Sequence, residues 1–248
     1  MTIQNEAELA ALLRIGRIVG LTLQHMAAAI EPGMSTAALD ELGARFLRRH
    51  GARSAPILTY NFPGHTCISL NDEAAHGIPG RRLIRPGDLV NIDVSAELDG
   101  FFADTGSSFG VAPLSATQRR LLATGRQALD AAIHAARAGR HLSAIGRAVE
   151  RVAQPAGFQI IRELGGHGVG RSLHEAPHAV PHYFNRKARG QLREGMVLTL
   201  EPFLTAGKPH IRKARDGWTL RTVDGTPAVQ FEHTVVITRD MPMLVTAV

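Results

Sequence analysis

The chain has 248 residues, 44% of them hydrophobic, which is enough to bury a large core in one or two domains. No apolar run approaches the roughly 20 residues of a membrane-spanning helix, and the N-terminal segment lacks the apolar stretch of a secretory signal. Cys67 is the only cysteine, so an internal disulfide is excluded and a cytoplasmic location is expected. The net charge of +6 comes from short basic bursts without interleaved aromatic residues, which favours solvated surface over a specific nucleic-acid site.

Two helices are predicted at the start of the chain. Apolar residues at helical spacing predict the first helix over 6–30, and Glu31-Pro32-Gly33 ends it. Ser35 is a suitable N-cap for a second helix that runs to about His50 and closes at Gly51.

A β-hairpin is predicted next. Residues 89–94 (L-V-N-I-D-V) and 101–109 have strand character, and Asp99-Gly100 is a turn dipeptide between them. If these two residues form the turn, Asp104 lies on the same face of the hairpin as Asp93, at diagonal-neighbour distance. A slip of one residue in this register would turn Asp104 to the other face.

Two more helices are expected in the second half of the chain. Ser115 and Gln118 form a capping box that opens a helix to about Ala138. A further helix is expected over roughly 143–154, and the rest of the chain is expected to be mostly strand and loop.

An internal repeat underlies this order of elements. Segment 31–40 resembles 138–146, and R-P-G-D-L-V-N-I-D-V (85–94) resembles R-E-G-M-V-L-T-L-E-P (193–202). The matched positions, offset by 106 or 108 residues, are Gly33 with Gly139, Gly51 with Gly157, Gly87 with Gly195 and Asp93 with Glu201. The repeat predicts an α+β fold in which 1–248 is a single domain of two pseudo-repeats, about 6–110 and 115–240.

Four carboxylates are placed by this repeat. Asp93 and Glu201 end apolar strands, and each has a companion: Asp104 in the hairpin and Glu232 in the β-prone run 231–238. A single carboxylate in such a strand is usually paired with an arginine or caps a bulge. Four that converge, together with one neutral imidazole, suit a pair of divalent metal ions.

The stretch G-G-H-G-V-G-R-S-L-H-E-A-P (165–177) supplies that imidazole. His167 is surrounded by glycines, which allow close approach of other groups. Phosphate binding by the glycine-rich loop is the rival interpretation, but the stretch has no Walker lysine and no strand–helix context. His174 is too far along the chain to be an obvious co-ligand. We expect His174, and His76 in A-A-H-G-I-P-G, to act as an acid or hydrogen-bond donor to a substrate.

Seven stretches, in order along almost the whole chain, carry a specific resemblance. They are N-D-E-A-A-H-G-I-P (71–79), G-D-L-V-N-I-D-V (87–94), D-G-F-F-A-D-T (99–105), G-H-G-V-G-R-S-L-H-E-A-P (166–177), G-M-V-L-T-L-E-P (195–202), D-G-W-T (216–219) and F-E-H-T-V-V-I-T (231–238). The chain resembles the short, bacterial-like type I methionine aminopeptidases. The resemblance implies the pita-bread fold with an internal pseudo-twofold duplication, which agrees with the repeat.

The resemblance also implies a chemistry. It implies hydrolytic removal of the N-terminal methionine from nascent proteins and peptides with a small second residue, by a metal-bridging hydroxide. It implies two divalent metal ions per chain (Co, Mn, Fe or Zn), whose ligands would be Asp93, Asp104, His167, Glu201 and Glu232. Glu201 would also be a general base, and His76 and His174 would hold the scissile amide.

The methionine pocket implied by the resemblance is less well matched. Phe62, Cys67 and Trp218 occupy positions that bind the methionine side chain or form its rim. Residues that depart from the pattern are Pro56, Thr59, Leu164, Gly165 and Leu173. We therefore keep a same-fold metallo-aminopeptidase of altered specificity as the alternative, with a non-enzymatic binding protein behind it. A monomer is expected, with nascent N-termini as partners, a transient ribosome contact, no membrane and no specific nucleic acid.

Overall fold

The computed structural model describes all 248 residues as a mixed α/β molecule. The helices are α1 (Glu6–Ala28), α2 (Thr36–Arg49), α3 (Ala55–Tyr60), α4 (Ala116–Ala135) and α5 (Leu142–Ala153). The strands are β1 (Arg53–Ser54), β2 (Cys67–Leu70), β3 (Glu73–Ala75), β4 (Leu89–Leu98), β5 (Phe101–Gly110), β6 (Gln159–Ile160), β7 (Gly166–Gly168), β8 (Glu175–Val180), β9 (Val197–Leu200), β10 (Phe203–Thr205), β11 (Ile211–Lys213), β12 (Leu220–Thr222), β13 (Ala228–Gln230), β14 (His233–Val236) and β15 (Met243–Leu244). None of the helices is both long and apolar enough to cross a lipid bilayer.

The predicted helix starts are confirmed by their caps. The Ser35 hydroxyl accepts a hydrogen bond from the Ala38 N–H at 3.1 Å, at the start of α2. At the start of α4, Ser115 and Gln118 each accept a backbone N–H from the other, as a capping box requires. The helix ends were predicted less accurately than the starts: α1 stops two residues and α4 three residues before the predicted ends.

The short helix α3 was not predicted, because residues 55–60 were expected to be strand or loop. The sequence signal for this helix is local and weak. Ser54 accepts a hydrogen bond from the Ile57 N–H, and Pro56 occupies the first turn, where its missing N–H costs nothing. Asn61 then ends the helix with a left-handed backbone (φ 56°). This short helix of six residues places Tyr60 and Phe62 beside the candidate site.

The hairpin has the predicted register. β4 and β5 pair antiparallel with Ser95 opposite Asp104, and Asp93 lies two residues from Ser95 on the same face. Asp99 and Gly100 both have positive φ, at 52° and 80°, which matches a two-residue type I′ turn.

The duplication is visible in the backbone. Gly33 donates its N–H to Ile84 O at 2.8 Å, and the repeat-related Gly139 donates to Leu192 O at the same distance. Both glycines have left-handed φ, 92° and 85°, as do the pairs Gly51 and Gly157, and Gly87 and Gly195. Each half therefore uses the same backbone frame to connect its helix pair to its strands.

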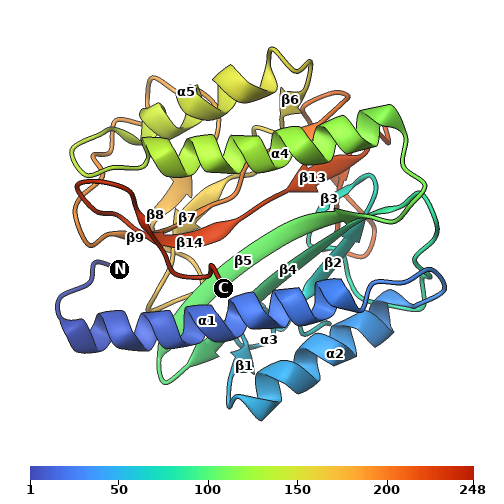
Figure 1. Cartoon of the computed structure of the whole chain (residues 1–248), viewed down its shortest axis with the longest axis horizontal. Helices are drawn as coiled ribbons and strands as arrows, with labels where there is room; N and C mark the ends of the chain where they lie inside the picture. The colour runs from blue at the N-terminus through green and yellow to red at the C-terminus, as the bar shows by residue number, and fades with distance from the viewer.

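Each half also has its own core. Figure 1 shows α1 and α2 along one side of the molecule and α4 and α5 along the opposite side, with the strands between them. A cluster of 22 buried apolar residues packs mainly α1, α2, β4 and β5, and one of 23 packs mainly α4 and α5 against the strands of the second half. The strands on which the candidate site is built lie between these two cores.

Candidate metal centre and active site

A cavity of about 530 Å³ opens where the two halves meet. Its walls include four of the five predicted metal ligands, both predicted substrate-binding histidines and all three predicted pocket residues. They are Asp93, Asp104, His167, Glu201, His76, His174, Phe62, Cys67 and Trp218. The fifth predicted ligand, Glu232, is 2% exposed and is not among the residues that line the cavity.

The first half supplies two aspartates through the hairpin register. Asp104 is 6% exposed, and its backbone is fixed by the second half, because its N–H donates to Thr234 Oγ1 at 3.0 Å and its C=O accepts from the same hydroxyl. Burial raises the pKa of Asp93 to about 6. Burial, and then the charges of Asp93 and Glu201, raise the pKa of Asp104 well above its ordinary value.

The second half supplies Glu201 directly after β9. The Thr199 hydroxyl donates to Glu201 Oε1 at 2.8 Å and accepts the backbone N–H of His167 at 3.0 Å. The Glu201 N–H donates to Nε2 of the fully buried His182 at 3.1 Å. Two neighbours thus hold Glu201, Thr199 at its side chain and His182 at its backbone, and its predicted place at the end of a strand is confirmed to within one residue.

Glu232 lies directly before β14 and joins the halves. Gln230 Nε2 donates to Glu232 Oε2 at 2.9 Å, and Asn91 of β4 donates to Gln230 Oε1 at 2.8 Å. The Glu232 N–H donates to the Gly106 C=O of β5 at 2.8 Å. A side chain at Gly106 would collide with the Gln230 amide and displace it from its hydrogen bonds to Asn91 and Glu232.

His167 presents a lone pair to the carboxylates. Its Nδ1 lies 2.9 Å from the Gly168 C=O, which can only accept, so Nδ1 carries the proton and Nε2 is unprotonated. Nε2 lies 3.4 Å from Glu201 Oε1 and 3.9 Å from Asp104 Oδ2. Burial, and to a smaller extent the neighbouring His174, lowers the pKa of His167 to about 3, which keeps the ring neutral.

The chemistry of these groups fits a divalent cation. One ligand atom from each of Asp104, His167 and Glu232 lies within 4.8 Å of the others. Asp104 Oδ1 and Glu232 Oε1 are buried without a hydrogen-bond partner, which is costly for a carboxylate unless a cation is bound. Burial and the adjacent carboxylates raise the pKa of Glu232, and burial raises that of Glu201. Oxygen ligands with one neutral imidazole are a donor set for Mn, Fe, Co or Zn.

The two histidines predicted to bind substrate line the cavity from different elements. His76 follows β3 with a left-handed backbone (φ 55°), and enclosure by protein, together with Lys213, lowers its pKa. His174 precedes β8, and its ring centroid lies 3.9 Å from that of His167. Burial, and to a smaller extent His76, lowers the pKa of His174 to about 4.

The apolar part of the cavity contains the predicted pocket residues. Phe62 packs edge-on against Trp218 with ring centroids 5.2 Å apart, and Cys67 is 7% exposed. Four of the five residues that depart from the expected pattern line the cavity: Pro56, Leu164, Gly165 and Leu173. Thr59 is exposed and is not part of the lining.

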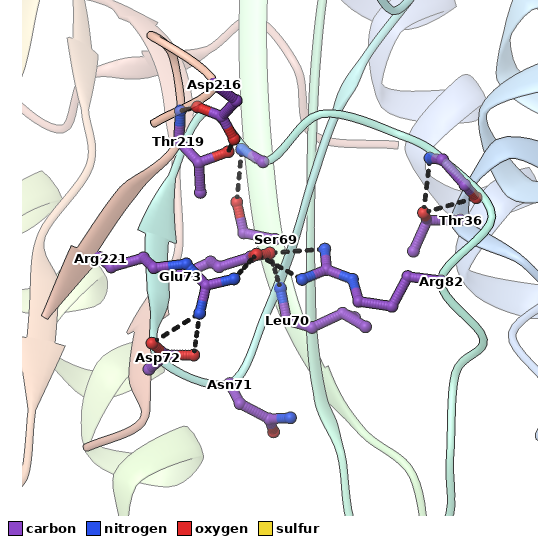
Figure 2. A network of polar contacts seen from close by, with 12 residues as sticks. Thr36, Ser69, Leu70, Asn71, Asp72, Glu73, Arg82, Asp216, Thr219 and Arg221 are labelled. Atoms are coloured by element: carbon purple, nitrogen blue, oxygen red, sulfur yellow. Dashed lines mark hydrogen bonds and ion pairs between the residues drawn. The ribbon is translucent and has the colours of Figure 1, made fainter. Parts of the chain in front are cut away.

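An ionic network fixes the loops that carry His76 and Trp218. Figure 2 shows Glu73 between Arg82 and Arg221. Glu73 is 4% exposed; its Oε1 lies 2.6 Å from Arg221 Nη2, its Oε2 lies 2.6 Å from Arg82 Nη2, and Oε2 also accepts the Leu70 N–H. Because β3 of the first half pairs with β12 of the second, the network stabilises the strand pair between His76 and Trp218.

Several residues of the site were not predicted from the sequence. Thr199 could have been found, since it precedes Glu201 by two residues, the same-face spacing of a strand. Gln230 stands in the same relation to Glu232. Tyr60, whose hydroxyl lies 2.7 Å from His174 Nδ1, gave no signal because its position depends on the unpredicted helix α3.

Comparison with known proteins agrees with this geometry. The model of metallopeptidase family M24 matches residues 10–239. Methionine aminopeptidase 2 of Bacillus subtilis is 45% identical over 247 residues, covering 99% of both chains. The crystal structure of methionine aminopeptidase from Rickettsia prowazekii has a TM-score of 0.94 and 33% identity, with full coverage of both chains. Prolidase from Pyrococcus furiosus, at 21% identity and a TM-score of 0.79, shares the fold over 66% of its own length. The fold is therefore the pita-bread fold, and the chain belongs to metallopeptidase family M24.

Proposed function

We propose that this protein is a metal-dependent methionine aminopeptidase of type I. Its substrates would be nascent proteins and peptides with an N-terminal methionine and a small second residue, and it would act in the cytoplasm. The observation that carries the proposal is the buried cluster of Asp104, His167 and Glu232, of which Asp104 and His167 line a partly apolar cavity. Full-length relatives named methionine aminopeptidases support it. Because both pseudo-repeats contribute to this one cavity, we treat residues 1–248 as a single catalytic domain.

The five proposed ligands would hold two divalent ions. Asp93 and Asp104 come from the first half, and His167, Glu201 and Glu232 from the second. When bound, such ions act as Lewis acids and lower the pKa of water toward neutrality. Thr199 donates to Glu201 Oε1 and so fixes the carboxylate, which would take the proton of the attacking water as general base.

The remaining residues would bind the substrate. His76 and His174 are neutral at pH 7 and can donate N–H bonds to the scissile carbonyl oxygen as negative charge develops on it. Phe62, Cys67 and Trp218 form an apolar pocket for an unbranched side chain such as methionine.

A same-fold aminopeptidase of different specificity is the second candidate. The observation that favours it is that Pro56, Leu164 and Leu173, which depart from the expected pattern, line the cavity, while the predicted metal-binding residues are all present. This second candidate predicts that the same metal centre removes an N-terminal residue other than methionine.

The proposed transient ribosome contact has a suitable surface. Residues 115–195 contain 13 Arg and Lys against five Asp and Glu. Arg140, Arg147 and Arg151 line one groove of about 470 Å³ along α5. Co-sedimentation with ribosomes should weaken in the triple variant Arg140→Glu, Arg147→Glu, Arg151→Glu. The same charge change at the exposed Arg17, Arg45 and Arg49 should have little effect. Equal loss in both variants would contradict a specific contact surface.

Peptide hydrolysis tests the function directly. Metal-stripped protein, resupplied with Mn or Co, would be assayed on Met-Ala-Ser, Leu-Ala-Ser and an Xaa-Pro peptide, with Asp93→Ala as control. Release of methionine alone, lost in the control, is the expected result. Preference for another residue would support the second candidate, and no metal-dependent release from any peptide would overturn both.

A further inference from the structure

Tyr60 reaches the site from the last residue of α3. Its hydroxyl lies 2.7 Å from His174 Nδ1, and the two ring centroids are 5.6 Å apart. Ser54 caps the start of this helix, and Asn61 ends it in the left-handed region, so the backbone position of Tyr60 is fixed from both sides. This is the one hydrogen bond that the Tyr60 hydroxyl makes to protein.

The direction of this hydrogen bond decides where His174 carries its proton. Partial burial of Tyr60, which is 45% exposed, and then the charge of Asp104, raise the pKa of Tyr60, so its hydroxyl is protonated at neutral pH. A hydroxyl can donate or accept, whereas a neutral imidazole has one protonated and one unprotonated nitrogen. If the hydroxyl donates to Nδ1, the His174 proton is on Nε2; if it accepts, Nε2 carries a lone pair.

The surroundings favour donation by Tyr60. His167, whose ring is 3.9 Å from that of His174, already directs a lone pair toward the carboxylates. Asp93, Asp104 and Glu201 make this part of the cavity acceptor-rich, so a second lone pair there is electrostatically unfavourable and an N–H is favourable. The two adjacent histidines then have opposite tautomers: His167 with Nε2 free to bind a cation and His174 with Nε2–H free to donate.

We propose that Tyr60 is a positioning residue that holds His174 in the Nε2–H tautomer, so that His174 donates a hydrogen bond to the substrate carbonyl. The donation to substrate rests on the proposed aminopeptidase function, but the tautomer itself does not. A hydrogen bond between neutral groups contributes about 0.5–1.5 kcal/mol. Tyr60→Phe should therefore lower kcat by roughly 2- to 13-fold, with KM nearly unchanged if the bond strengthens only as charge develops.

The decisive measurement is the tautomer, read from histidine ring ¹⁵N chemical shifts of the metal-free protein at pH 7.5. The His174 signals would be assigned with His174→Gln. We expect an unprotonated, hydrogen-bonded Nδ1 and a protonated Nε2 in the parent protein, and a mixture of tautomers in Tyr60→Phe. Tyr183→Phe is the matched control, because Tyr183 is the other of the two tyrosines and stacks under Arg162 away from the cavity.

Each outcome separates this proposal from the proposed function. A protonated Nδ1 in the parent protein, or shifts that do not change in Tyr60→Phe, would overturn it even if the protein releases methionine. Conversely, the expected shifts in a protein with no peptidase activity would leave the tautomer assignment intact and overturn only the enzymatic role. A fall of kcat in Tyr183→Phe equal to that in Tyr60→Phe would also contradict it.

Discussion

In the first half, Asp93 and Asp104 project from the middle of one continuous hairpin, whereas in the second half Glu201 and Glu232 lie just outside the strands β9 and β14. The backbone frame around them is shared, down to matched left-handed glycines and matched hydrogen bonds. The two halves therefore share their backbone geometry at the matched glycines and differ in where their strands end relative to the carboxylates.

This difference changes how each carboxylate is held. The aspartates are placed by strand register, and a hairpin of ten paired positions specifies that register strongly. The glutamates are placed by polar neighbours instead: Thr199 and His182 for Glu201, and Gln230, bonded to Asn91 of the other half, for Glu232. Strand pairing therefore positions the carboxylates of the first half. Side-chain contacts position those of the second half, which lie beyond the ends of their strands.

The largest expected effect tests whether the halves are equivalent at the metal centre. Asp104→Asn in the first half and Glu232→Gln in the second should each lower kcat/KM by about a thousandfold, because a bound metal supplies several kcal/mol of transition-state stabilisation. Metal content by atomic absorption should fall in parallel. If only one of the two substitutions lowers metal content and activity, the claim that both halves contribute metal ligands is wrong.

The next effect concerns the cost of burying charge in the metal-free protein. Burial raises the pKa of Asp93 from 3.8 to about 6, so its ionised form destabilises the fold. This destabilisation is absent below about pH 4, grows as pH rises from 4 to 6, and is fully present above pH 7. Asp93→Asn should thus raise stability in EDTA at pH 7.5 and leave it unchanged at pH 4, as measured by urea unfolding.

An aspartate of the second half gives the control of opposite sign. Hydrogen bonds from the Lys208 N–H and then from Thr226 lower the pKa of Asp224 from 3.8 to about 2. Its stabilising contribution is present above pH 4 and is lost as pH falls through 2. Asp224→Asn should therefore destabilise the protein at pH 7.5. A loss of stability in Asp93→Asn at pH 7.5 would contradict the cost of burial at Asp93, and a gain in Asp224→Asn would contradict the stabilising hydrogen bonds of Asp224.

The smallest expected effect tests the shared frame alone. Gly33 and Gly139 have φ of 92° and 85°, and a Cβ added to either would meet no atom within 4 Å. Alanine at each position would therefore cost only the strain of the left-handed backbone, about 1–2 kcal/mol. Urea unfolding of Gly33→Ala and Gly139→Ala should give equal losses, and clearly unequal losses would mean that the frames are not equivalent.

The sequence by itself determined the elements whose signals are local. Ser35, Ser115 and Gln118 mark helix starts through bonds to backbone groups within three residues. Asp99-Gly100 sets the hairpin register, because few other residue pairs accept two positive φ values. The repeat then placed Glu201 by analogy with Asp93, and glycine spacing singled out His167.

Only the tertiary structure decided which distant groups touch. The bond between Tyr60 and His174 joins residues 114 positions apart, and the bond between Asn91 and Gln230 joins residues 139 apart. Nothing local to these residues encodes such contacts, because they arise only after the two cores have packed and the strands of both halves have met. The same packing withdraws four carboxylates from water, and that desolvation raises their pKa values and makes the site suitable for a cation.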